Sequence, residues 1–306
     1  MTKRVVRDIA ASVRQRLLNK AREEKRPFNE LLQYYAMERF LYRLSKSPYS
    51  KKFVLKGALM LAAWKAPISR PTMDIDLLGK TDNDVGAVVA AIRKICAQAV
   101  EPDGLKFDAD SVAGRRITEA ADYEGVRVRF RGSMGNAQVT MQVDVGFGDI
   151  IVPSSKQTEY PTILDMPVPR LQGYSKESMV AEKLESMVKL GVINSRLKDF
   201  FDVWLLSQQF DFDGQTPAKA IERTFSKRRT DIPPEPTALT PVYSEDPSRA
   251  AQWRGFVRRN RLERVPAELG EVIRTLHSFL VPITRILKEG LEFRKVWHAP
   301  GPWVEY

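Results

Sequence analysis

Two aspartates one residue apart, Asp74 and Asp76, are the side chains in this sequence best suited to chemistry. They alternate with Ile75 and Leu77 in an apolar run. On a β-strand, alternate side chains point to the same face, so we expect both carboxylates on one face and both apolar side chains on the other. Two adjacent acids repel each other, and Mg²⁺ is commonly held by one or two carboxylates together with substrate phosphates. The pair therefore predicts a Mg²⁺ site, although the Asp-x-Asp spacing alone also occurs in turns.

The residues before this pair are of the kinds that bind phosphate. Residues 53–56 resemble a short apolar strand that ends in Lys56, and Gly57 predicts a turn that opens a helix. The start of a helix presents backbone N–H groups and the positive end of its dipole to an anion. Arg70 adds a second cation and Thr72 a hydroxyl. We expect a nucleotide to bind beside these four residues; the alternatives are a plain tight turn at Gly57 and a solvated strand end at Lys56.

A third carboxylate, Asp144, lies near the end of another strand pattern. Residues 139–145 alternate apolar and polar side chains, which is typical of a half-buried strand, and Asp144 lies on the polar face. If this strand neighbours the one with Asp74 and Asp76, the three acids complete a metal site. Otherwise Asp144 is an ordinary acid at a strand end. Asp149 follows in a glycine-rich stretch and is better explained as a turn residue.

The composition excludes several classes of site and of protein. The chain has 306 residues, of which 43% are hydrophobic, with one cysteine and two histidines. A single cysteine rules out a disulfide framework and a cysteine zinc site, and Cys96 lies in an apolar helical pattern that predicts a buried thiol. No motif supports catalysis by either histidine. The charged N-terminus has no apolar signal region, and no run of 18 apolar residues predicts a membrane helix. We therefore expect a cytoplasmic protein.

The net charge of +11 and the pI of about 9.7 favour a polyanionic partner. Each phosphate neutralised by a protein cation releases condensed counterions, which drives nucleic-acid binding. Any single basic run is usually a solvated face, but four runs beside a phosphate-handling motif favour nucleic acid. These runs cover residues 14–26, 127–131, 227–229 and 254–264.

Hydrophobic periodicity divides the chain into a mixed α/β part and a helical part. In the first part we expect helices at 1–26, 29–44 and 84–99, a strand–turn–helix–strand unit at 53–78, and antiparallel strands at 105–119, 124–131 and 137–145. The second part predicts helices at 179–190, 198–206, 217–226, 249–262 and 267–289, with a loop at 230–247. Between the parts, residues 150–173 hold four prolines and indicate an extended connection. The sequence assigns no role to the tail from residue 295.

The motifs together resemble the AbiEii/AbiGii toxin family, nucleotidyltransferase-like toxins of bacterial toxin–antitoxin and phage-defence systems that are related to the MenT toxins. The resemblance spans residues 53–206. Its most specific part combines an Ala-Glu-Lys helix with a Lys-Asp-x-x-Asp helix. The matching segments are Leu55–Leu59 with Arg70–Leu77, Val143–Asp149, Val180–Glu185 and Asn194–Trp204, and the run Thr224–Arg228 also fits.

The resemblance implies an α/β (α+β) fold with a nucleotidyltransferase-like N-lobe, built on a small mixed sheet with helices, and a mostly helical C-lobe, with an NTP in the cleft. On these grounds we expect N-terminal helices at 1–50 that pack on the catalytic lobe, the catalytic lobe at 51–165 and the helical lobe at 166–306. Asp74 and Asp76 match the metal-binding acids of the family. The other functional positions match residues of the second lobe. Lys183 matches the invariant lysine that contacts nucleotide phosphate, and Asp199 matches the last catalytic acid. Arg196 matches the motif arginine and Asp202 lies close to Asp199; we expect both to bind the nucleotide.

One departure concerns the first turn. Nucleotidyltransferases often have Gly-Ser there, with the hydroxyl on phosphate, whereas this chain has Gly57 and Ala58. The phosphate contact must then come from backbone amides, from Lys56 or from another hydroxyl such as that of Thr72.

Three hypotheses about function remain. The first is a Mg²⁺-dependent nucleotidyltransferase toxin that uses an NTP to modify an RNA; the family implies the 3′ end of tRNA as the target and a cognate antitoxin as a partner. The second is transfer of a nucleotide or phosphate to a protein. The third is a non-catalytic module that binds nucleotide or antitoxin and in which the aspartate pair is structural.

Overall fold

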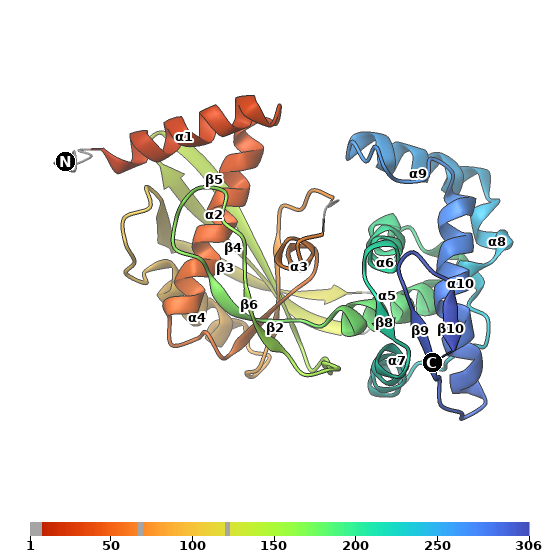
Figure 1. Ribbon diagram of the computed structural model, residues 1–306. Helices are drawn as coiled ribbons and strands as arrows, with labels where there is room; N and C mark the ends of the chain where they lie inside the picture. Colours follow the sequence, from red (N-terminus) through yellow and green to blue (C-terminus); the bar gives the residue numbers. More distant parts are fainter. Residues whose placement is uncertain (1–7, 67–69, 120–122, 306) are drawn as a thin grey trace. The chain divides into compact units, whose positions relative to one another are not determined.

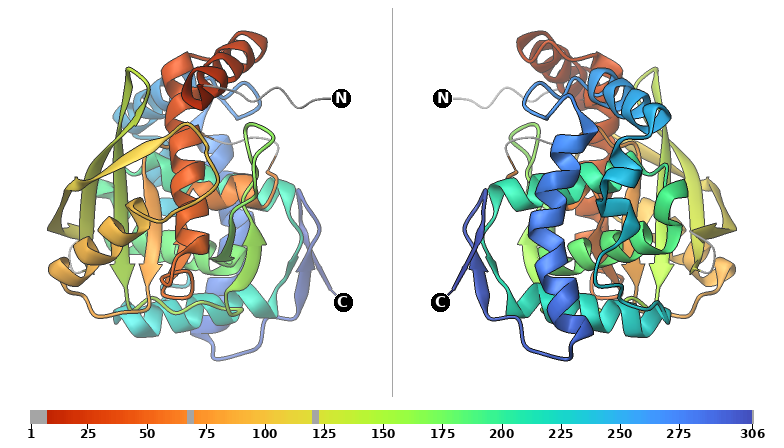
Figure 2. Two further views of the ribbon diagram at one scale, coloured as in Figure 1. Left: turned by 90° about the vertical axis from the view of Figure 1, so that its left-hand side faces the viewer. Right: turned by 90° about the vertical axis from the view of Figure 1, so that its right-hand side faces the viewer.

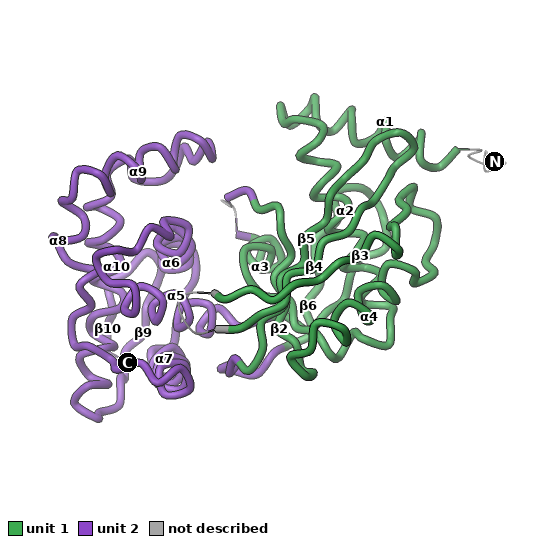
Figure 3. The backbone as a smooth tube through the Cα atoms, turned by 180° about the vertical axis from the view of Figure 1, so that it is seen from behind, with its two compact units in different colours: residues 1–65, 72–148, 156–173 green, residues 66–71, 149–155, 174–306 purple. Residues whose placement is uncertain are grey.

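The computed structural model describes residues 8–66, 70–119 and 123–305, and the chain forms two compact units (Figure 3). Unit 1 comprises residues 1–65, 72–148 and 156–173, and unit 2 comprises residues 66–71, 149–155 and 174–306. The predicted division at residues 50 and 165 stays a prediction. The N-terminal helices fall in unit 1 together with the sheet, and so do residues 156–173. The fold is mixed α/β, as predicted.

Unit 1 is built on a mixed sheet of seven strands within the described residues, in the order β3-β4-β5-β2-β1-β7-β6. Two pairs, β2 with β5 and β1 with β7, are parallel, and the other neighbours are antiparallel. The strands are β1 (Phe53–Lys56), β2 (Ile75–Gly79), β3 (Lys106–Glu119), β4 (Tyr123–Met134), β5 (Ala137–Phe147), β6 (Lys156–Glu159) and β7 (Arg170–Gly173). The predicted strands of this part are confirmed.

The predicted extended connection at 150–173 is wrong in one respect, because it contains the two strands β6 and β7. Each has only four residues, too few to show a periodic pattern beside the prolines around them. Strand β7 pairs in parallel with β1 and so extends the sheet.

Helices α2 (Phe28–Lys46) and α4 (Val85–Cys96) cover one face of this sheet, and α1 (Ile9–Glu23) packs against α2 (Figures 1 and 2). The core between helices and sheet includes Phe40 of α2, whose ring lies 5.3 Å from that of Phe130. Cys96 is buried there as predicted, and burial raises the pKa of its thiol to about 12. Helix α2 begins at Phe28, one residue before the predicted start at residue 29.

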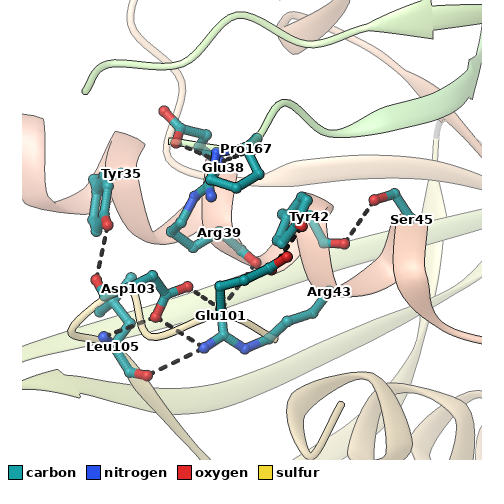
Figure 4. Close-up of polar contacts among 10 residues, drawn as sticks. All are labelled: Tyr35, Glu38, Arg39, Tyr42, Arg43, Ser45, Glu101, Asp103, Leu105 and Pro167. Carbon is teal, nitrogen blue, oxygen red and sulfur yellow. Dashed lines mark hydrogen bonds and ion pairs between the residues drawn. The ribbon is translucent and has the colours of Figure 1, made fainter. Parts of the chain in front are cut away.

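Helix α2 also carries two buried ion pairs that fix loops of unit 1 (Figure 4). The Arg43 guanidinium donates to both carboxylate oxygens of Asp103, at 2.6 and 3.1 Å. Glu38 and Arg39 lie 2.8 Å apart and also bond to the main chain of residues 160–169, at 2.6 and 2.8 Å. Burial raises the pKa of Glu38 to about 7. These charges are structural, because each is matched by a partner inside the unit.

Unit 2 is mostly helical, as predicted, and its elements lie within a few residues of the predicted ranges. Its longer helices are α5 (Lys176–Leu190), α6 (Leu197–Gln209), α7 (Gln215–Arg228), α9 (Pro247–Arg259) and α10 (Leu269–Lys288). The predicted loop at 230–247 contains the short helix α8 (Pro241–Ser244). No helix in the described part of the chain is both long enough and apolar enough to cross a membrane.

The C-terminal tail completes the core of unit 2. Strands β9 (Lys295–Trp297) and β10 (Trp303–Glu305) pair with each other, and β9 also pairs with β8 (Phe212–Asp213). Trp297 is buried, and Trp303 stacks on Phe279 of α10 with ring centroids 5.6 Å apart. The tail therefore anchors itself on α10 through its tryptophans.

Candidate active site

The three predicted metal ligands lie together in unit 1. Strands β2 and β5 are parallel neighbours, and their register places Asp76 directly beside Asp144. Asp74 lies just before β2, and each of the three residues has a carboxylate oxygen within 4.8 Å of those of the other two. Asp144 is buried, whereas Asp74 and Asp76 are half-buried and open to a ligand. The condition on which the sequence prediction depended, that these strands are neighbours, is thus confirmed.

Gly57 shapes the space around Asp76. It has a φ of +69°, a conformation that favours glycine, and a Cβ added to it would lie 2.0 Å from Oδ2 of Asp76. The turn therefore brings bare backbone against the carboxylate. Lys56, the residue before it, lies opposite Asp76 in the antiparallel register of β1 and β2. Both residues of the predicted phosphate-binding turn are therefore next to a predicted metal ligand.

The helix that this turn opens is short. Helix α3 (Leu59–Ala63) has five residues, and the N–H groups of Met60 and Leu61 donate to the carbonyls of Gly57 and Ala58 at 3.0 and 3.1 Å. These N–H groups are already bonded within the turn, so the predicted phosphate site at a helix start receives no support from them. The contribution of the turn is its close approach to Asp76.

Thr72 orients the first aspartate of the pair. Its hydroxyl donates to Oδ1 of Asp74 at 2.6 Å, and its backbone N–H donates to the hydroxyl of Tyr34 at 2.9 Å. Thr72 is only 7% exposed. The hydroxyl that the sequence offered for phosphate therefore bonds to a predicted metal ligand and fixes its rotamer.

Arg127 on β4 supplies counter-charge to the third acid, a role that the sequence analysis did not assign. Its Nε and Nη2 donate to the two oxygens of Asp144 at 2.8 and 2.7 Å, and the Gln142 amide donates to the same carboxylate at 3.3 Å. Arg127 faces Asp144 across the antiparallel strands. The sequence shows alternating arginines at 127–131, but which of them faces Asp144 depends on the strand register, which only the fold reveals.

The acid cluster fits a divalent cation. Three carboxylates within reach of one another form the all-oxygen donor set that Mg²⁺ and Mn²⁺ prefer. The glycine at position 57 leaves room for the Asp76 carboxylate, with which a Cβ at that position would clash. The Arg127 guanidinium offsets the charge of one member of the cluster, Asp144.

A second cluster of predicted site residues lies in unit 2, on α5, α6 and the segment 66–71. The Lys183 ammonium contacts Asp199 at 2.6 Å and Asp202 at 2.8 Å. The Arg70 guanidinium donates to both oxygens of Asp202 at 2.8 and 2.9 Å. The two cations and two carboxylates balance, and the Asp202 side chain is fully buried.

Electrostatics hold both central groups of this cluster in their charged forms. Burial opposes the charge of Lys183, but the nearby carboxylates outweigh burial and raise the pKa of its ammonium. Burial likewise opposes the charge of Asp202, yet Lys183 and Arg70 together lower the pKa of its carboxyl. The cluster is therefore an ion-pair network at neutral pH.

A small pocket adjoins the acids in unit 1. It has a volume of about 200 Å³ and is lined by Met73, Asp74, Arg129, Thr140 and Gln142. Met73 is 58% exposed, so its apolar side chain is accessible at the pocket. The pocket thus combines an apolar wall, a cation and a predicted metal ligand.

Comparison with known proteins decides the family. The sequence matches the family model described as nucleotidyl transferase AbiEii toxin, type IV toxin–antitoxin system, over residues 39–275, more than half of the chain. The chain belongs to the AbiEii family. It is therefore a nucleotidyltransferase of the toxin–antitoxin class, enzymes that generally use an NTP with a divalent metal, and this class implies an antitoxin partner.

Solved structures and curated proteins add little to this assignment. A candidate nucleotidyltransferase from H. pylori is similar with a TM-score of 0.49 and 13% identity, covering 86% of this chain and 98% of its own. The Helicobacter pylori protein JHP933 is similar with a TM-score of 0.42 and 12% identity, covering 85% of this chain and 97% of its own. No curated protein matches the sequence.

The AbiEii motifs fall at two places in the chain. Unit 1 holds the aspartate pair together with Asp144, Lys56, Gly57 and Thr72. Unit 2 holds the ion-pair cluster of Lys183, Asp199, Asp202 and Arg70. Arg196, the motif arginine, is half-buried at the start of α6, where its carbonyl accepts from the Asp199 N–H at 2.8 Å. Their roles in binding and catalysis stay predictions.

Arg228 is a half-buried residue of the AbiEii region for which the sequence gave no partner. Its guanidinium lies 2.8 Å from Glu185, 2.9 Å from Asp149 and 3.8 Å from Glu182. Burial opposes its charge, but these carboxylates raise its pKa. The two glutamates and Asp149 therefore share one arginine, and Asp149 is more than a turn residue. The Thr-Phe-x-x-Arg run was the only signal of this network.

Proposed function

We propose that this protein is a Mg²⁺-dependent AbiEii toxin that transfers a nucleotide from an NTP to the 3′ end of an RNA, with tRNA the expected target, and so arrests growth. The observation that carries the proposal is the group of three carboxylates in unit 1, each with an oxygen within 4.8 Å of the others. The net charge of +11 favours RNA over a protein as the acceptor.

In this proposal Asp74, Asp76 and Asp144 hold the metal. When bound there, Mg²⁺ would offset charge on the triphosphate and on the leaving pyrophosphate and lower the pKa of the acceptor hydroxyl. The 3′ oxygen of the acceptor forms a bond to the α-phosphorus, the bond from that phosphorus to pyrophosphate breaks, and the hydroxyl proton passes to one of the carboxylates. Thr72 orients Asp74 through a hydrogen bond, and Gly57 leaves room for the Asp76 carboxylate, because a Cβ at position 57 would lie 2.0 Å from its Oδ2.

The positively charged residues have separate tasks. Lys56 lies opposite Asp76 and is placed to contact the triphosphate. Lys183 matches the AbiEii lysine, for which we propose a contact to nucleotide phosphate, with Asp199 as the last catalytic acid. A lysine held in its charged form stabilises charge that builds on transferring phosphates. Arg70 and Asp202 bond to each other, so we assign them to positioning Lys183 while Arg196 is proposed to bind nucleotide.

Transfer to RNA can be tested directly. Purified wild-type protein and an Asp76→Asn variant are incubated with each labelled NTP in turn, Mg²⁺ and total tRNA, and the RNA is separated on a denaturing gel. We expect the wild type to lengthen tRNA with at least one NTP and the variant to lose about a hundredfold or more of that rate, as expected when a catalytic group is misplaced. Label on a protein band would favour the second hypothesis, and no label on RNA with any NTP would refute RNA modification.

Growth after induced expression tests the biological part. We expect wild type to arrest growth and a folded Asp76→Ala variant to leave growth unaffected. If both arrest growth alike, the aspartate pair is structural and a non-catalytic binding mechanism takes its place.

A further inference from the structure

One face of the sheet in unit 1 carries a row of charged residues. The opposite face is packed on α2 and α4, so Val126, Val128 and Phe130 of β4 are buried while the arginines between them point the other way. Seen from behind in Figure 3, none of the described helices of unit 1 lies over strands β3 to β5 on this side. Within the described part of unit 1, the face without a helix over it is thus basic in character.

The strand registers place this face beside the metal ligands. Five side chains on five neighbouring strands fall in one row: Arg115, Arg127, Asp144, Asp76 and Lys56. The next two positions of β4 on this face are Arg129, opposite Gln142, and Arg131, opposite Thr140. The arginines therefore form a continuous surface that ends at the acids.

Several of these arginines are available to a polyanion. The Arg129 guanidinium donates to the amide oxygen of Gln142 at 3.0 Å. This partner is uncharged, so the contact does not neutralise the arginine. Arg131 pairs with Asp108, but the two side chains are 68% and 41% exposed. An exposed ion pair of this kind is worth little, so a phosphate can take over the guanidinium at small cost. Arg115 is exposed on the same face.

The pocket of about 200 Å³ lies at the junction of the arginines and the acids. The exposed Met73 forms one wall and Arg129 another, and Asp74 is part of the lining. Unpaired bases bind where apolar side chains and guanidinium planes offer a surface for stacking. A base in this pocket would bring its ribose to the edge of the acid cluster.

We propose that this face binds the single-stranded 3′ end of the acceptor RNA. The last base occupies the pocket between Met73 and Arg129, and the preceding phosphates contact Arg129, Arg131 and Arg115. The inference rests on the proposed function, which it deepens by naming the surface that delivers the acceptor. A protein acceptor or an antitoxin would not need a pocket for a flat base beside the metal ligands.

A pair of neutralising variants tests the surface. Binding of a fluorescently labelled single-stranded RNA of about ten nucleotides, a length within the range of single-strand sites, is measured by anisotropy at several salt concentrations. The test variant is Arg129→Gln with Arg131→Gln. The matched control is Arg258→Gln with Arg259→Gln, which removes the same charge from exposed positions on α9 of unit 2.

We expect the test variant to bind RNA more weakly and with a smaller salt dependence, while the control behaves as wild type. The slope of log K against log salt should fall by roughly 1.4, about 0.7 for each single-strand phosphate that an arginine no longer neutralises. In the extension assay, its KM for RNA should rise. Met73→Ser should weaken RNA binding several-fold with the slope unchanged, because it removes a stacking surface and no charge. Mn²⁺ binding at the acids should be intact in both variants.

Different failures point to different errors. If wild type binds and extends RNA and the test variant binds with the same affinity and slope, this surface is wrong and the proposed function stands. If wild type neither binds nor extends any RNA, the RNA-modifying function itself fails. If the test variant binds RNA normally but no longer binds a purified antitoxin, the face is a protein-docking surface and the proposal is overturned.

Discussion

Replacing Gly57 with alanine should disable the metal site through one steric contact. The residue has a φ of +69°, and an added Cβ would lie 2.0 Å from Oδ2, 2.7 Å from Cγ and 2.8 Å from Cβ of Asp76. Because all three contacts are shorter than any normal carbon contact, a rotation of the carboxylate tip alone does not relieve them. The Asp76 side chain must move as a whole or the turn must open.

The size of the effect follows from these distances. Real Cβ atoms essentially never come closer than 3.0 Å to another heavy atom, so Oδ2 must move by at least 3.0 less 2.0, or 1.0 Å. A misplacement of about 1 Å costs an enzyme on the order of a hundredfold in rate. The positive φ adds a backbone cost of roughly 1–2 kcal/mol for a residue with a side chain.

A second glycine provides a control that separates the backbone strain of a positive φ from the steric clash with Asp76. Gly135, in the turn between β4 and β5, has a φ of +54° and no atom within 4 Å of an added Cβ. Gly135→Ala therefore carries the same kind of backbone strain without touching the acids. Thermal unfolding of both variants, Mn²⁺ titration followed by electron paramagnetic resonance, and nucleotide transfer together give the comparison.

We expect both variants to lose similar stability, and only Gly57→Ala to lose Mn²⁺ affinity and transfer. If Gly57→Ala binds Mn²⁺ and transfers nucleotide as well as Gly135→Ala does, then either Asp76 is not a ligand or the turn does not place it. Loss of both properties in Gly135→Ala as well would mean that general destabilisation, and not the steric clash with Asp76, explains the result.

Three further substitutions test other contacts. Arg127→Gln removes the cation that occupies Asp144, so Mn²⁺ should bind several-fold more tightly in the same titration; weaker binding would instead make the arginine a positioning group for that acid. Lys183→Met leaves buried carboxylates without their lysine and should cost about 3–5 kcal/mol in urea unfolding. The lowered pKa of Asp202 stabilises the folded state above about pH 4, where the carboxyl of the unfolded chain ionises. The free energy of unfolding of the wild type should therefore fall as the pH is lowered below this value, and that of Lys183→Met should fall less. Thr72→Val removes the hydroxyl that orients the first aspartate of the pair and should slow transfer about tenfold, whereas Thr72→Ser should retain the rate.

Alternation in the sequence was enough to predict the central strands and the acid cluster. Residues 139–145 put Asp144 on the polar face, and the structure places it beside Asp76 with the apolar partners buried. Long strands with one buried face carry this information in every second residue, since a slip of one residue would expose the apolar set. Strands β6 and β7 were missed because four residues do not establish a period.

Contacts between distant segments were beyond the reach of the sequence. Arg70 and Asp202 are 132 residues apart, and both were expected to bind nucleotide, yet their side chains bond to each other and Asp202 also contacts Lys183. Thr72 was expected on phosphate and instead bonds to Asp74 two residues away. Motif matching identifies residues that matter to a site, but the division between groups that touch the substrate and groups that position others depends on the packed geometry.

The same distinction applies to the basic runs, whose net charge first indicated a polyanion. On the helix α7, the run 227–229 sends Arg228 into a buried network with Glu185 and Asp149, where it serves the fold. On the strand β4, alternation sends Arg129 and Arg131 to an exposed face, next to weak or neutral partners. A charged side chain contributes to nucleic-acid binding only if breaking its ion pair within the protein costs less free energy than its new contact with a phosphate provides. By that criterion the arginines on β4 are better suited to bind RNA than the run on α7. Because they lie beside the three acids, the RNA that they bind would have its 3′ end at the proposed metal site.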